Sequence, residues 1–113
     1  MWVFTKHGFV SIVKSENSPQ FLLVRSRFEG HIEALFPTVH VSEVYAADYP
    51  YRALVQKPLV TQKLQELVAS IDYGNFNDAV KESHYHDACR EVSSILKMYE
   101  DRHQPHPSDE FMP

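Results

Sequence analysis

An apolar repeat in the last third of the chain constrains the fold more than any other feature. Between residues 85 and 99 apolar side chains recur three or four positions apart, which places them on one stripe of an α-helix. The stripe consists of Tyr85, Ala88, Cys89, Val92, Ile95, Leu96 and Tyr99. Such a helix requires a surface to cover, and the N-terminal half, rich in Val, Phe and Leu, supplies one. We therefore predict that this helix closes the core and that Ile95 and Leu96 are buried.

The first half of the chain is rich in residues that favour strands. Residues 2–13 carry many of them, and His7-Gly8 interrupts the run, so we predict one long strand that bends there. Turn-forming residues at 15–20 separate it from a second strand over residues 21–25. Two further strands are predicted over residues 39–45 and 51–56.

Two more helices are predicted from apolar spacing and from their end signals. The first spans Phe28–Phe36 and stops before Pro37. The second begins near Pro58, which suits a first helical turn, and Gly74 supplies its stop. Its apolar stripe consists of Val60, Leu64, Leu67, Val68 and Ile71. A short segment over residues 75–81 then leads to the closing helix.

This order of elements predicts an α+β fold. Hairpins alternating with helices favour a two-layer sandwich with an antiparallel sheet of about four strands, in the order ββαββα plus a C-terminal helix, of ferredoxin-like type. A length of 113 residues with 43% hydrophobic content fits one domain, which we place at residues 1–102. Residues 103–113 contain three prolines and little apolar periodicity, so a disordered tail is predicted there.

Charge and cysteine content narrow the class of protein. The net charge of -4 argues against a general affinity for nucleic acids, whose binders carry a basic excess. Cys89 is the only cysteine, so no intrachain disulfide can form. The apolar run Val3–Val13 is too polar for a signal sequence or a membrane span. We expect a cytoplasmic protein that does not bind membranes.

Self-association is also expected from the sheet. Helices on one side leave its other face exposed, so that either Val10 and Ile12 or Phe9 and Val13 point outward. A homodimer would cover these side chains.

Several short motifs together resemble a known family. They are Trp2-Val3-Phe4-Thr5 with Gly8-Phe9 (W-x-F-T-x-x-G-F), Val24-Arg25-Ser26-Arg27, Asp48-Tyr49-Pro50-Tyr51-Arg52, and Asp72-Tyr73-Gly74-Asn75-Phe76 (D-Y-x-N-F). The pattern is similar to that of a family of short, uncharacterised bacterial and phage-borne proteins. The resemblance implies a shared fold over residues 2–85 and assigns no catalytic residues.

Metal binding and cysteine catalysis both find little support. His84 and His86 point roughly 200° apart on a helix, so they cannot face the same ion. Cys89 belongs to the apolar stripe, where a buried thiol behaves as a small hydrophobic side chain. We predict no metal, no cofactor and no catalytic residue.

Arginines in apolar strands give the candidate ligand site. Arg25 and Arg52 lie in otherwise apolar strands, and if these strands pair, the two arginines with Arg27 could form an anion-binding patch together with Lys6 or His7. Alternatively, they lie on a solvated face and pair with Glu29, Glu33 or Glu43.

Two further sets of side chains complete the predicted site. The bend at residues 73–76 could present Tyr73 and Asn75 to a ligand, or it could simply end the preceding helix. His86 adds a titratable side chain to the predicted site. Tyr45, Tyr49 and Tyr51 near one turn suit a protein-facing surface. We therefore expect a non-enzymatic accessory protein that binds a partner protein or a small anionic ligand. The alternative is a small enzyme or nucleic-acid-processing factor that uses the sheet arginines with His7 and His86.

Overall fold

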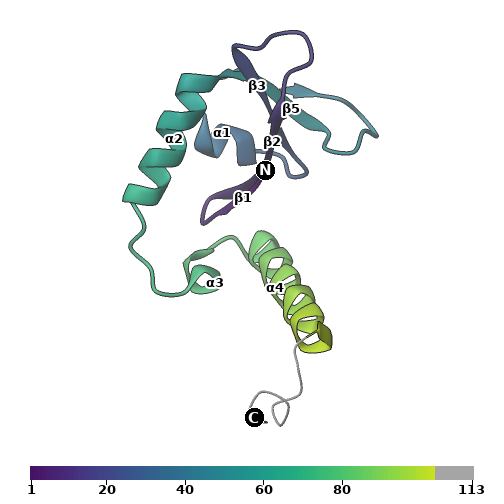
Figure 1. Ribbon diagram of the computed structural model, residues 1–113, viewed down its shortest axis with the longest axis vertical. Coiled ribbons are helices and arrows are strands. Elements are labelled where there is room, and N and C mark those ends of the chain that lie inside the picture. Colours follow the sequence, from purple (N-terminus) through teal and green to yellow (C-terminus); the bar gives the residue numbers. More distant parts are fainter. Residues whose placement is uncertain (104–113) are drawn as a thin grey trace, which may run out of the picture. The chain divides into compact units, whose positions relative to one another are not determined.

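The computed structural model of the protein describes residues 1–103 (Figure 1). The chain divides into two compact units, Met1–Lys81 and a second unit that begins at Glu82. Within the described residues, the first unit holds all the strands and the helices α1 to α3, and the second holds the long helix α4. Along residues 1–103 no helix combines the length and apolar character that crossing a membrane requires.

The first unit is built on one antiparallel sheet, which confirms the α+β class. The sheet order is β1-β2-β3-β5-β4, and every neighbouring pair is antiparallel. The strands are β1 (Trp2–Thr5), β2 (Gly8–Lys14), β3 (Phe21–Ser26), β4 (Ser42–Glu43) and β5 (Tyr51–Gln56). The described sheet therefore has five strands rather than about four, and the ferredoxin-like arrangement is not confirmed.

The additional strand arises at Lys6-His7. We predicted one bent strand over residues 2–13, but the chain reverses there, and Thr5 pairs with Gly8 in a tight hairpin. The Thr5 hydroxyl donates to the Gly8 carbonyl (2.8 Å) and accepts from the backbone N–H groups of His7 (3.2 Å) and Gly8 (3.1 Å). A buried side chain thus satisfies the turn, which a strand-propensity argument does not detect.

Two helices pack against one face of the sheet. Helix α1 (His31–Leu35) contacts β2, β3 and β5, and α2 (Lys57–Ala69) contacts β3 and β5. The buried core between these layers consists of Val10, Ile12, Val24, Ile32, Leu35, Phe36, Ala53, Val55 and Val60. Because side chains alternate along a strand, the neighbours of these strand residues point to the opposite face.

The alternation of side chains along β2 shows which of the two predicted pairs points away from the helices. Val10 and Ile12 belong to the helix-covered core, so the alternative that places them on the outward face is wrong. Phe9 and Val13 lie on the opposite face, where Phe9 is buried and Val13 is half-buried.

The predicted stop of the first helix agrees with the structure, because α1 ends at Leu35 with Phe36 as its C-cap, directly before Pro37, but the predicted stop of the second helix does not. Helix α2 ends at Ala69, five residues before Gly74, and the backbone N–H of Ser70 closes its last turn on the Glu66 carbonyl (3.0 Å). Between these residues and α4 lies the short helix α3 (Phe76–Ala79), which Asn75 caps.

Helix α4 (Ser83–His103) exists as predicted, but its apolar stripe is not buried along its length. Tyr85 and Cys89 are buried, whereas Ile95 and Leu96 are 52% and 65% exposed. Our prediction that these two side chains lie in the core is therefore wrong. Periodicity shows which residues share a helix face and does not show that a surface covers that face. The helix includes His103, and the rest of the predicted tail lies outside the described residues.

Candidate functional site

The predicted arginine pair exists on the sheet. Strands β3 and β5 are neighbours, and their register places Arg25 directly opposite Arg52. On its other side Arg25 faces Ser11 of β2, and its Nη2 donates to the Ser11 hydroxyl (3.1 Å). Because Val24 and Ala53 belong to the core, both arginines point to the face away from α1 and α2.

Tyr49, in the turn that precedes β5, contacts two arginine side chains, Arg25 and Arg27. It is only 5% exposed and adopts a left-handed backbone conformation with φ 65°. The guanidinium carbon of Arg25 lies 4.3 Å from the centre of its ring, and that of Arg27 lies 4.1 Å from it. Both distances are within the range of cation–π attraction, so one aromatic ring gathers two positive charges.

Arg52 fixes the turn itself. Its Nε donates to the carbonyl of Tyr49 (3.1 Å), and its Nη2 donates to the carbonyl of Asp48 (3.3 Å). A left-handed conformation in a bulky residue such as Tyr49 is strained, so it requires fixed partners. Arg52 therefore acts mainly as a clamp on the turn that carries Tyr49.

Among the described contacts, only one of these three arginines pairs with a carboxylate. Asp48 forms an ion pair with Arg27, and their hydrogen bond raises the pKa of the Arg27 guanidinium against the opposing effect of burial. The alternative pairing of the arginines with Glu29, Glu33 or Glu43 is not found in residues 1–103. We call Arg25, Arg27 and Arg52 the arginine cluster.

The arginine cluster has unused hydrogen-bond donors. A guanidinium offers five N–H groups, and the described bonds occupy only a few of them. The Nε of Arg25 is buried and has no hydrogen-bond partner. A buried donor without an acceptor costs about 1–3 kcal/mol, so an oxygen acceptor that reached it would be favourable.

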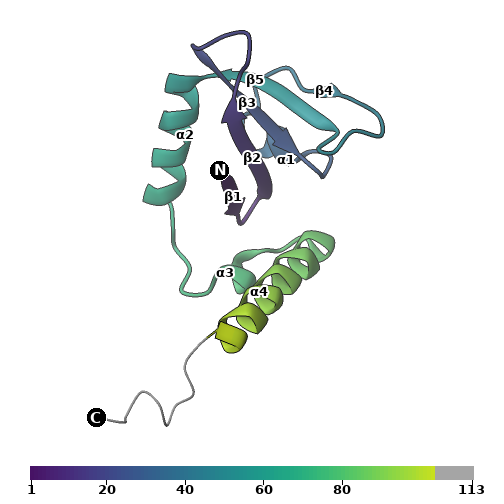
Figure 2. The same ribbon diagram turned by 45° about the vertical axis from the view of Figure 1, so that its right-hand side comes forward.

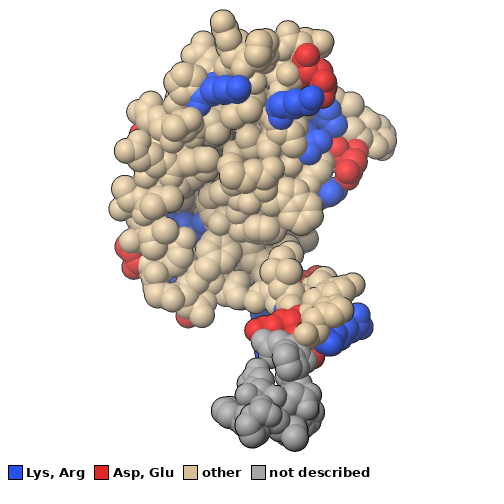
Figure 3. Space-filling view, viewed as in Figure 1, with Lys and Arg blue, Asp and Glu red and all other residues tan. Residues whose placement is uncertain are grey.

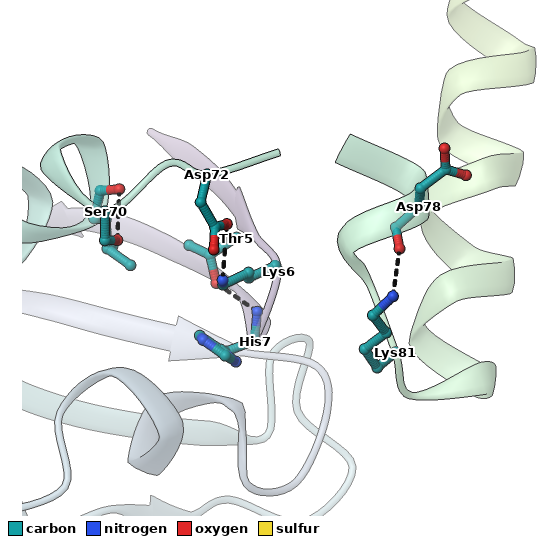
Figure 4. A network of polar contacts seen from close by, with 8 residues as sticks. Thr5, Lys6, His7, Ser70, Asp72, Asp78 and Lys81 are labelled. Carbon is teal, nitrogen blue, oxygen red and sulfur yellow. Dashed lines mark hydrogen bonds and ion pairs between the residues drawn. The ribbon is translucent and has the colours of Figure 1, made fainter. Parts of the chain in front are cut away.

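The other predicted site residues of the first unit lie elsewhere. His7 and Tyr73 line a cavity of about 310 Å³ between β1 and α2, and Tyr73 and Asn75 line a second one of about 330 Å³. The Asn75 side chain accepts a hydrogen bond from the Asp78 backbone (3.2 Å), so it caps α3. The ammonium group of Lys6 pairs with Asp72 (3.2 Å, Figure 4) and does not join the arginine cluster in the described contacts.

His86 belongs to the second unit, on α4. It is half-buried, and its Nδ1 lies 3.9 Å from the carboxylate of Asp87. Within the part of the chain that the structure describes, no three His, Cys, Asp or Glu side chains are placed to hold a metal ion.

Cys89 offers a direct test of the second unit. Burial raises the pKa of its thiol, although a hydrogen bond from Tyr85 opposes the shift. Because the thiolate is the reactive form, we expect slow modification by a disulfide reagent at pH 7.5 and fast modification in urea. Ellman's reagent measures both rates. Equal rates in the two solvents would contradict the burial of this side chain.

Sequence reasoning missed the roles of Tyr49 and Asp48. Tyr49 was grouped with Tyr45 and Tyr51 as a protein-facing surface, but it is buried while Tyr45 is fully solvated, at 92% exposed. The available signal was the pair of arginines flanking Ser26 together with Asp48-Tyr49-Pro50 just before Arg52.

No protein-family model, curated protein or solved structure matches this chain. The resemblance to short bacterial and phage-borne proteins remains a prediction.

Proposed function

We propose that the protein is a non-enzymatic accessory protein that binds a small anion of the carboxylate or phosphate class at the arginine cluster. The observation that supports this most directly is the excess of three guanidinium groups over the single carboxylate of Asp48. The buried Nε of Arg25 adds a donor that lacks an acceptor. A partner protein with an acidic side chain would supply the same chemistry.

The physical case for an anion rests on charge and donor geometry. Two guanidinium groups gathered by one tyrosine ring repel each other, and a bound oxyanion would offset that repulsion. Guanidinium forks match carboxylate and phosphate oxygens, and such charge-assisted bonds are stronger than neutral ones. The Arg27 side chain is 47% exposed, so the cluster reaches the surface.

The enzymatic alternative has less support. It requires a histidine that works beside the sheet arginines, but His7 lines the cavity between β1 and α2 instead. For His86, the described ion pair is with Asp87 on the same helix.

The test is a calorimetric titration of the full chain with inorganic phosphate and, separately, with citrate. We expect Arg25→Gln to weaken binding by at least about tenfold, because a hydrogen bond to a charged group is worth about 1.5–3 kcal/mol. Arg90→Gln is the matched control, because Arg90 is exposed on α4 and its described ion pair is with Asp87. Its affinity should equal that of the unsubstituted protein.

Asp48→Asn tests whether the negative charge of Asp48 opposes anion binding at the arginine cluster. Removing the carboxylate that pairs with Arg27, the one carboxylate on the arginine cluster among the described contacts, should tighten anion binding by about two- to fivefold, since an exposed ion pair is worth about 0.2–1 kcal/mol. No heat of binding for either anion, or weaker binding by Asp48→Asn, would exclude the arginine cluster as a small-anion site.

A further inference from the structure

Strand β1 leaves one edge of the sheet without a partner. It is the outermost strand in the sheet order, and it pairs only with β2 among the described strands. Met1 and Ile12 exchange both backbone hydrogen bonds, each 2.8 Å long. In an antiparallel pair such residues alternate with residues whose backbone groups point the other way. The N–H and C=O groups of Trp2 and Phe4 therefore face outward, where a further strand could bind them.

A groove runs beside this free edge. The cavity of about 310 Å³ is lined by β1, by its hairpin turn, by the last turns of α2 and by residues that follow α2, and we call it the edge groove. Figures 1 and 2 both show α2 beside β1. On the α2 side Val68 and Ile71 are 70% and 54% exposed, although both line the groove. Exposed apolar side chains gathered at a groove indicate an interaction site.

The lining of the edge groove carries no acidic side chain. Lys6 supplies a positive charge at its hairpin end, and none of the residues that line it is Asp or Glu. Lys6 contacts Asp72, which stands outside the lining and is 73% exposed in its side chain, so solvent weakens that ion pair. In the view of Figure 3, the centre of the first unit is tan, and the Lys, Arg, Asp and Glu side chains lie mostly toward its edges.

We propose that the edge groove binds an extended peptide segment of a partner protein, which adds to the sheet as a strand beside β1. An extended backbone presents donors and acceptors at the strand spacing that Trp2 and Phe4 require, whereas a compact ligand does not. The segment carries apolar side chains at alternate positions, which pack against Val68 and Ile71. An acidic residue at one end lies near Lys6. Because β1 has four residues, four to six residues of the peptide are engaged.

The first test uses a defined peptide, the capped sequence acetyl-Glu-Val-Thr-Val-Thr-Val-amide. Trp2 is the only tryptophan and is 65% exposed, so an added strand should cover it and shift its fluorescence to shorter wavelength. Two further versions of the peptide are N-methylated on alternate residues, one on the nitrogens that would face β1 and the other on the nitrogens that would face away from it. The first should lose binding, because its methyl groups block the hydrogen bonds to β1, and the second should bind like the parent peptide. Equal binding by all three peptides, or no binding by the parent, would overturn the proposal.

The second test removes a single edge donor from the protein. Trp2→Pro lacks the outward N–H, and proline is tolerated on an edge strand where that N–H faces solvent. Trp2→Ala also loses the indole but keeps the N–H, so it is the matched control. Calorimetry with the parent peptide should show Trp2→Pro binding about two- to tenfold more weakly than Trp2→Ala. Equal affinities would show that no strand pairs with β1.

A third test asks whether the peptide binds in the edge groove or at another exposed apolar side chain. Ile71→Asp should weaken peptide binding, both by removing apolar contact and by repelling the acidic residue. Val44→Asp is the control, because Val44 is also exposed but lies outside the edge groove. If the chain alone forms a dimer that Trp2→Pro dissociates, a second copy occupies the edge and the peptide proposal fails. Phosphate binding at the arginine cluster does not depend on any of these outcomes.

Discussion

Replacing Ile32 by Ala is expected to lower the free energy of unfolding by about 2–5 kcal/mol. Ile32 is fully buried at 0% exposure, and it lies on α1, which contacts three strands of the sheet. The substitution leaves a cavity among close-packed neighbours that cannot collapse to fill it. Against a typical stability of about 5–15 kcal/mol this is a large fraction. Urea unfolding, monitored by circular dichroism, measures the shift in the unfolding midpoint.

Leu96→Ala is the control for this experiment. Leu96 is also a large aliphatic side chain on a helix, but it is mostly exposed, so its replacement should change stability by less than about 0.5 kcal/mol. A loss in Leu96→Ala as large as that in Ile32→Ala would mean that the second half of α4 is covered in solution.

Gly8→Ala is expected to destabilise the protein by about 1–3 kcal/mol, although it adds only one methyl group. A Cβ at Gly8 would lie 2.8 Å from Cγ and 2.9 Å from Cβ of His31. The His31 ring cannot swing aside freely, because its Nδ1 accepts a hydrogen bond from the Phe9 backbone (3.0 Å). The added methyl therefore forces the hairpin and the start of α1 apart.

Gly74→Ala provides the comparison at a glycine with space around it. Nothing lies within 4 Å of a Cβ at that position. Its effect on the unfolding midpoint should stay within about 0.5 kcal/mol. If thermal and urea unfolding gave the same stability for the two variants, close approach of His31 would not be the reason for glycine at position 8.

Local sequence signals predicted some elements well and others poorly. Strand β5 has the predicted bounds, because a run of strand-forming residues lies between Pro50 and Pro58. The hairpin at Lys6-His7 was missed because its turn depends on the Thr5 hydroxyl, and a Thr in a β-rich run reads equally well as strand. Burial along α4 was overestimated because it depends on what covers the helix, which no local pattern encodes.

The candidate site was predictable only in part. The arginines attracted attention because charged side chains are unusual in apolar strands, and pairing of β3 with β5 then brought Arg25 and Arg52 together. The contribution of Tyr49 depends on a left-handed backbone in a turn, which sequence rarely reveals for a residue of this size. His7, Tyr73 and Asn75 were assigned to one site with the arginines, but tertiary packing places them around other cavities.

The sheet order also governs how rapidly the chain reaches its native state. Strands β1, β2 and β3 are joined in sequence by hairpins, so the first 26 residues form a meander whose loops close at little entropic cost. The partner of β3 on its other side is β5, which begins only at Tyr51. During synthesis on the ribosome, β3 therefore presents an unpaired edge until β5 has emerged, and this interval is when nascent chains are most prone to associate with one another.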